Sequence, residues 1–201
     1  KNVNQILLSV EDFEAKKENK KDFLIRFLRH EQALVNAIIF CNRKKEVSYL
    51  SGLLRKNNLI AGEIHGDLDQ KARMEMVKNF KDGHLKYLVA SDVAARGLDI
   101  PNVSHVINFD VPLNPEDYVH RIGRTGRAGK KGTAITIVQE KDRALISNIE
   151  ALINEKIQPL NKGWLKSIVE TSNTKEKTPA VNAQPPNRAQ SQLPDFLFTK
   201  F

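Results

Sequence analysis

The sequence of 201 residues has little cysteine and no long apolar run. Its one cysteine, Cys41, cannot form an internal disulfide or a zinc cluster, so we expect a reducing compartment and no structural metal. A membrane span needs roughly 18 unbroken apolar residues, and the sequence contains neither such a stretch nor an apolar signal-peptide core. These absences predict a soluble, cytoplasmic protein with no membrane partner and no metal site.

The charges of the chain are unbalanced, because 32 Lys and Arg residues stand against 24 Asp and Glu residues, for a formal charge of +8. Such an excess favours a polyanionic partner, although it is also compatible with plain solubility. The hydrophobic content of 40% is enough for one α/β core. Composition therefore predicts a single domain and makes nucleic acid a leading hypothesis for its partner.

Short apolar, β-branched runs alternate with longer segments of helical period along most of the chain. The expected strands are residues 5–10, 36–41, 60–64, 87–90, 103–109 and 133–138. The expected helices are residues 20–29, 44–56, 70–80, 115–122 and 141–153. This alternation predicts an α/β fold with a mostly parallel sheet and helices on both faces. Ligands of such sheets bind beyond the carboxyl ends of the strands, so functional residues are expected in the strand-to-helix loops.

The composition changes near the C-terminus, which divides the chain into a domain of residues 1–160 and a tail of residues 161–201. From about Thr171 the tail is rich in polar residues and proline, and it cannot bury enough apolar surface to offset its ordering entropy. It is predicted to be mostly disordered. Its end, residues 194–201, is apolar and aromatic again, which fits either a short docking peptide or an unstructured terminus.

Residues 118–129 combine three arginines with three glycines at the end of a predicted helix. Arg121, Arg124 and Arg127 provide planar, permanently charged donors, which suit the clamping of phosphate oxygens as they gain charge. Alternatively, cations near a helix C-terminus complement the macrodipole, and glycines end the helix. That alternative explains one arginine well and the whole group poorly.

The octet from His120 to Arg127, HRIGRTGR, resembles motif VI of the DEAD-box RNA helicases. The resemblance implies a RecA-like fold in which Arg124 and Arg127 act as catalytic arginine fingers on the γ-phosphate of ATP bound mainly to another domain. It also implies that His120 and Arg121 couple this site to the interdomain interface. Related DNA helicases typically begin this motif with Gln, so His120 argues against a DNA helicase.

Residues 88–101 form an apolar strand followed by a loop of small residues, and they resemble motif V of the same family, with Ser91 where Thr is usual. The resemblance implies that Asp99 binds the ATP ribose and that Arg96 joins the network around the nucleotide. Ser91 and Asp92 are then predicted to contact RNA. Local chemistry offers an alternative, in which Asp92 caps a helical turn and Arg96 pairs with Asp99.

A third group follows the strand expected at residues 60–64 and resembles motif IVa. The resemblance implies that Gly66 allows close approach of the backbone and that Arg73 grips RNA phosphate. Asp67 and Gln70 have the spacing of a capping box, so a well-capped helix is a second reading that can hold together with the first. The free N–H groups of such a helix also attract anions.

Residues 38–44 resemble motif IV, with Arg43 where the family often has Thr. This departure weakens the case for RNA contact, and we assign none here. Asn42 is expected to cap the helix that starts near Lys44.

The sequence contains no G-x-x-x-x-G-K-[ST] loop to cradle ATP phosphates and no Asp-Glu-Ala-Asp quartet to hold magnesium. The resemblance therefore implies half of an active site, with ATP and Mg²⁺ held mainly by an N-terminal RecA-like domain of the same protein. The fragment is expected to be monomeric, inactive alone, and to bind single-stranded or duplex RNA weakly through its phosphates. The alternatives are a stand-alone RNA- or protein-binding module and a DNA helicase.

Overall fold

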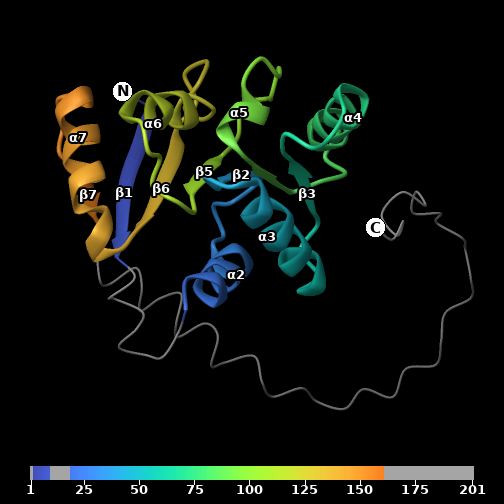
Figure 1. Ribbon diagram of the computed structural model, residues 1–201, viewed down its shortest axis with the longest axis horizontal. Helices are drawn as coiled ribbons and strands as arrows, with labels where there is room; N and C mark the ends of the chain where they lie inside the picture. The colour runs from blue at the N-terminus through green and yellow to red at the C-terminus, as the bar shows by residue number, and fades with distance from the viewer. Residues whose placement is uncertain (1, 10–18, 161–201) are drawn as a thin grey trace, which may run out of the picture.

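The computed structural model describes residues 2–9 and 19–160, which form a seven-stranded sheet flanked by helices (Figure 1). The strands are β1 (Val3–Ser9), β2 (Ala37–Phe40), β3 (Ala61–Ile64), β4 (Tyr87–Ala90), β5 (His105–Asn108), β6 (Gly132–Val138) and β7 (Gln158–Pro159). The helices are α2 (Lys20–His30), α3 (Lys44–Lys56), α4 (Gln70–Lys81), α5 (Asp92–Ala95), α6 (Pro115–Ile122), η1 (Glu140–Asp142) and α7 (Arg143–Ile153). The predicted tail, residues 161–201, lies outside the described residues.

The strand order is β3-β4-β2-β5-β6-β1-β7, and every strand pairing within the described part of the chain is parallel. Each crossover carries a helix, as parallel neighbours require. The predicted α/β class with a parallel sheet is therefore confirmed. The sequence did not predict α5 or the two-residue strand β7 as separate elements, because both are too short to show a period.

The strands are buried on both faces, so alternate residues of one strand belong to different hydrophobic clusters. Ala37 and Ile39 of β2 pack with apolar residues of α2 and α3. Ile38 and Phe40 pack with residues of α4 and α5 on the opposite face. Figure 1 shows these two helix pairs on opposite sides of the sheet. Cys41 is fully buried in the first cluster, where burial raises the pKa of its thiol, so it is a core residue as expected.

Residues at the helix termini determine where α2, α6 and η1 begin. Asn19 caps α2 by accepting hydrogen bonds from the backbone N–H groups of Lys21 and Asp22. Pro115 occupies the first turn of α6, where its missing N–H has no cost. The helix expected at residues 141–153 is interrupted at its start, since the side chains of Gln139 and Asp142 form a capping box around η1. The remaining bounds differ from prediction by a residue or two.

Helix α6 runs back across the sheet from the carboxyl end of β5 towards its amino end. Its first turn follows the loop after β5, whereas Thr125, just beyond its last turn, bridges to Val103, which precedes β5. Tyr118 of α6 packs against Ile146 and Ile149 of α7 in a third buried cluster. Helix α6 is therefore anchored to α7 through Tyr118, and the octet that begins on it is anchored to the segment before β5 through Thr125.

Among the helices of residues 2–9 and 19–160, none combines the length and apolar character needed to cross a membrane.

Candidate functional site

The carboxyl ends of four neighbouring strands, β3, β4, β2 and β5, meet at one end of the sheet. Ile64 of β3 pairs with Ala90 of β4, and Phe40 of β2 pairs with Ala90 and with Asn108 of β5. The loops that follow these strands therefore lie side by side, as the parallel arrangement predicts. Several predicted site residues, including Gly66, Ser91 and Asp92, are brought together at this end of the sheet.

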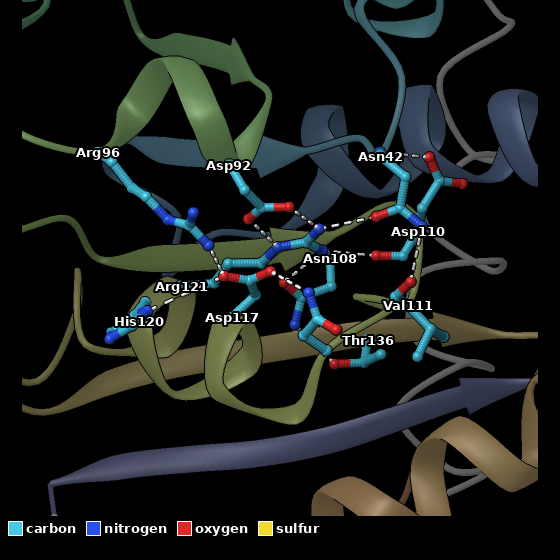
Figure 2. A network of polar contacts seen from close by, with 11 residues as sticks. Asn42, Asp92, Arg96, Asn108, Asp110, Val111, Asp117, His120, Arg121 and Thr136 are labelled. Atoms are coloured by element: carbon cyan, nitrogen blue, oxygen red, sulfur yellow. Dashed lines mark hydrogen bonds and ion pairs between the residues drawn. The ribbon is translucent and has the colours of Figure 1, made fainter.

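Arg121 of α6 lies at the centre of this end of the sheet with only 1% of its side chain exposed (Figure 2). Its Nε and Nη2 each donate to one carboxylate oxygen of Asp92 at 2.7 Å, and Nη2 also donates to Oδ1 of Asn42 at 2.8 Å. Nη1 donates to the backbone oxygen of Asp110 at 2.7 Å and to Oδ1 of Asn108 at 3.4 Å. All five N–H donors of the guanidinium thus have acceptors inside the domain. The buried charge ties α6 to α5 and to the ends of β2 and β5.

Asn42 serves this network and does not cap α3, so the capping prediction is wrong. Its side-chain amide donates to the backbone oxygen of Val111 at 2.9 Å, and its backbone N–H donates to Asp110 Oδ2 at 3.0 Å. The N-cap of α3 is Arg43, which has no side-chain capping bond. The side-chain oxygen of Asn42 does not cap α3 because the buried guanidinium of Arg121 needs it as an acceptor.

The alternative in which Asp92 caps a helical turn does not hold. Ser91 is the N-cap residue of α5, without a side-chain capping bond, and Asp92 is the first residue of the helix. Both carboxylate oxygens of Asp92 are used by Arg121, because the buried guanidinium needs a charged acceptor in bidentate geometry. Ser91 is buried, and its backbone N–H donates to the oxygen of Ile64 at 3.1 Å, beside the loop that carries Gly66.

A second set of polar contacts lies next to Arg121 and centres on Asp117 of α6 (Figure 2). The buried carboxylate of Asp117 accepts a hydrogen bond from Nη2 of Arg96, and it lies 4.0 Å from Nδ1 of His120. Arg96 and His120 are themselves more than half exposed. Sequence reasoning predicts no role for Asp117, since an acid in the first turn of a helix is ordinary. The one sequence feature that could have indicated its role is the spacing of three residues from His120, which places the two side chains on the same face of α6.

Arg124, Arg127 and Asp99 lie in the loops that follow α6 and α5, although the side chain of Arg124 still lines a small pocket with Asp92 and Arg121. The backbone oxygen of Arg124 accepts a hydrogen bond from Val103 N at 3.0 Å, which places it at the amino end of β5. Arg127 is held nearby, because its backbone N–H donates to Oδ1 of Asn102 at 3.1 Å. The backbone of this group therefore lies away from the strand ends, because α6 carries the octet across the sheet.

Charges within this group act on one another. Burial, and then the charge of Arg127, lower the pKa of the Arg124 guanidinium. Lys81 of α4 lies 2.6 Å from Asp99 and lowers the pKa of its carboxyl, with smaller contributions from the two arginines. The alternative in which Arg96 pairs with Asp99 does not hold, since Asp117 pairs with Arg96 and Lys81 pairs with Asp99.

The donors of Arg127 are largely unused. Its Nε donates to the backbone oxygen of Gly123, and within the described residues its two terminal nitrogens have no acceptor. Arg124 makes one long contact, from Nη1 to the oxygen of Leu98 at 3.4 Å. These exposed or half-buried guanidinium groups carry donors that an external anion can take.

The loop after β3 is shaped by Arg73. Its Nε donates to the backbone oxygen of Leu68 at 3.0 Å and its Nη2 to that of Gly66 at 3.3 Å. Asp69 caps α4 by accepting from Ala72 N at 2.7 Å, so the helix is well capped, but by Asp69 and not by Asp67. Arg73 keeps Nη1 without an acceptor in the described part of the chain.

Gly66 is not required by the domain itself. A Cβ atom at this position would meet nothing within 4 Å, and its backbone is not left-handed. Gly126 differs, because it has φ of 69° and a Cβ there would lie 2.5 Å from Val3. The exposed Gly66 therefore leaves a bare backbone open to an external group.

No group of acids, histidines and cysteines that could hold a metal ion occurs in residues 2–9 and 19–160.

Residues 19–129 match the family described as the helicase conserved C-terminal domain. Over 154 residues the chain is 47% identical to the ATP-dependent RNA helicase CshA of Listeria monocytogenes, which covers 76% of this chain and 30% of that protein. Over 169 residues it is 42% identical to the DEAD-box ATP-dependent RNA helicase CshA of Bacillus subtilis, covering 84% and 33% respectively. The chain thus spans about a third of the length of these curated relatives.

Solved structures give the same picture. The crystal structure of the E. coli DEAD-box protein SrmB, bound to the regulator of ribonuclease activity A, has a TM-score of 0.73 and 34% identity, over 96% of this chain and 99% of that chain. The C-terminal domain of the DEAD-box protein Dbp5 has a TM-score of 0.72 and 30% identity, over 86% and 97%.

Proposed function

Because the chain belongs to the helicase conserved C-terminal domain family, as the RecA-like C-terminal domain of a DEAD-box RNA helicase, we propose that it supplies arginine fingers for ATP hydrolysis and phosphate contacts to RNA. One observation carries the first part. Arg124 and Arg127 keep unused donors, whereas Arg121 in the same motif uses all of its donors internally.

The arginine pair fits a polyphosphate. Arg124 and Arg127 share a small region with Asp99, an acceptor that suits a ribose hydroxyl. Guanidinium groups supplied across a closing cleft stabilise the charge that develops on a transferring phosphoryl group, and they do so only when the cleft is shut. Arg96 is held by Asp117 at the edge of this region. ATP and Mg²⁺ are proposed to be held mainly by the N-terminal RecA-like domain.

The RNA contacts are proposed to come from the strand-end loops. Gly66 offers bare backbone, Arg73 keeps Nη1 without an acceptor among the described residues, and the largely buried Ser91 has its hydroxyl beside this loop. Since Arg121 occupies both oxygens of Asp92, we assign Asp92 to holding the Ser91 loop in place for RNA. Such contacts address the backbone of RNA and predict weak, salt-sensitive, sequence-tolerant binding.

His120 and Arg121 are proposed to couple the nucleotide to the domain interface by different routes. His120 is exposed beside Asp117 and is free to contact a partner domain. Arg121 is buried, so its coupling acts through the positions of Asp92 and Asn42. We also propose that residues 1–160 form one domain, and that the protein is cytoplasmic and the fragment monomeric.

The test of the finger assignment is Arg127→Ala in this chain joined to its N-terminal domain. RNA-stimulated ATP turnover should fall by about 10³-fold or more, because the transition-state charge loses its partner. Arg143→Ala is the matched control, since Arg143 is an exposed arginine on α7 that pairs only with Glu140 in the described residues. Turnover in Arg127→Ala equal to the control would refute the assignment. Measurable turnover by the isolated chain would refute the proposal that it needs its other half.

A further inference from the structure

His65 stands at the root of the loop that carries Gly66, and its ring is nearly buried, with 10% of the side chain exposed. Its Nδ1 lies 3.3 Å from the backbone N of Asp67, and its Nε2 lies 3.1 Å from Oγ of Ser48 on α3. Two acids lie near the ring in the described part of the chain: Glu63 of β3, at 3.8 Å from Nε2, and Asp67, whose carboxyl feels the charge of His65. The imidazole therefore connects the loop to α3.

The hydrogen-bond chemistry fixes the tautomer of this ring. A backbone N–H can only donate, so Nδ1 of His65 must be the acceptor for Asp67. A neutral imidazole then carries its proton on Nε2, which donates to Ser48. Both ring nitrogens are thus used in defined roles, and one of them holds a backbone N–H of the loop.

The same loop is held from two other sides. Lys44 of α3 lies 2.7 Å from the carboxylate of Asp67, on the solvent side where both side chains are exposed. Arg73 of α4 takes the backbone oxygens of Gly66 and Leu68. His65 is the buried member of these three contacts and the one that orients the N–H of the residue after Gly66.

We propose that His65 is a positioning residue for RNA binding: its Nδ1 fixes the peptide between Gly66 and Asp67, and thereby sets the backbone that Gly66 presents to phosphate. This inference rests on the proposed contact of that loop with RNA. A residue in this role changes the affinity for RNA and leaves the chemistry of ATP hydrolysis alone, because Arg124 and Arg127 make their hydrogen bonds to Leu98, Gly123 and Asn102 and not to the Gly66 loop.

The deciding comparison is His65→Asn against His65→Gln in the full-length protein. The amide oxygen of Asn lies at the distance of Nδ1 and can still accept from Asp67 N, whereas that of Gln reaches the place of Nε2 and faces Ser48. We expect His65→Asn to bind a labelled single-stranded oligonucleotide within about twofold of the unsubstituted protein. His65→Gln should bind roughly tenfold more weakly, the value of one lost hydrogen bond. Turnover at saturating RNA should be equal in both.

Two outcomes would overturn the inference: Gln binding RNA as tightly as the unsubstituted protein, or Asn binding as weakly as Gln. Amide hydrogen exchange at Asp67 gives a readout that needs no RNA, and it should be faster in His65→Gln alone. If the unsubstituted protein binds no RNA, the proposed function fails. The exchange data then report on the loop separately, and equal exchange in both variants would refute the positioning role.

Discussion

Arg121 and Arg127 lie six residues apart in one octet and have opposite surroundings. Arg121 is 1% exposed, and each of its N–H donors has an acceptor in the domain. Arg127 is exposed, and its terminal nitrogens have no acceptor in the described residues. The octet therefore joins an arginine that holds the domain together to arginines that are available to a ligand.

The physical reason for the difference is desolvation. A buried guanidinium is tolerated only when ion pairs and hydrogen bonds replace its water, so the neighbours of Arg121 are fixed by its charge. A group that meets a substrate charge must keep donors unused until the substrate arrives. Substitutions at the two positions should therefore separate stability from activity.

The largest expected effect on stability belongs to Arg121→Ala. Removal of this partner leaves the Asp92 carboxylate and several buried acceptors uncompensated, so the free energy of unfolding should fall by about 3–5 kcal/mol. Arg127→Ala should change it by less than about 0.5 kcal/mol. Urea unfolding of the chain measures both. Equal losses of stability in the two variants would break the comparison.

His105 is a buried base whose burial is not offset by an ion pair among the described residues, in contrast to Arg121, so its protonation should destabilise the fold. His105 is 4% exposed, and burial lowers its pKa to about 4. Between pH 6.5 and 4 the unfolded chain binds a proton that the folded chain does not, so stability falls as the pH falls through this window. The loss is roughly 3 kcal/mol. Unfolding measured at pH 7 and pH 4 should show this slope, and His105→Gln should remove it. An unchanged slope in the variant would exclude His105 as its source.

The loop at Gly66 allows a similar separation of stability from binding. Gly66→Ala has room for its methyl group, so unfolding should change by less than about 0.5 kcal/mol. The methyl group should hold phosphate away from the backbone and weaken RNA binding roughly tenfold in the joined protein, as for one lost hydrogen bond. Gly52→Ala on α3 also has free space and is the control. Equal RNA affinity in the two variants would contradict the contact.

The smallest effects are expected for exposed ion pairs. Lys81→Met should raise the pKa of the Asp99 carboxyl towards its usual range, because Lys81 is the main cause of its lowering. Lys44→Met should do the same for Asp67. Neither substitution should measurably change unfolding, since surface pairs contribute little. Carboxyl titration by NMR checks the shifts, and a clear loss of stability in either variant would show that exposed pairs matter more here than assumed.

The parallel sheet and most helices followed from the sequence, because buried strands and amphipathic helices have distinct periods. The hydrogen-bond partners of the polar side chains could not be predicted in this way. Asn42 and Asp92 have good capping chemistry, and local reasoning assigned them to caps, yet both serve Arg121 from 79 and 29 residues away. Local propensity was overridden because a buried charge outweighs a cap.

By itself the sequence determined the α/β class, the order of its elements and the family to which the octet belongs, since these depend on periodicity and on neighbouring residues. Only the tertiary structure decided which arginine of the octet is buried, that Asp117 holds Arg96, and that His65 anchors the Gly66 loop. Those roles depend on contacts between distant segments, and burial sets whether a donor is used within the domain or left for a ligand.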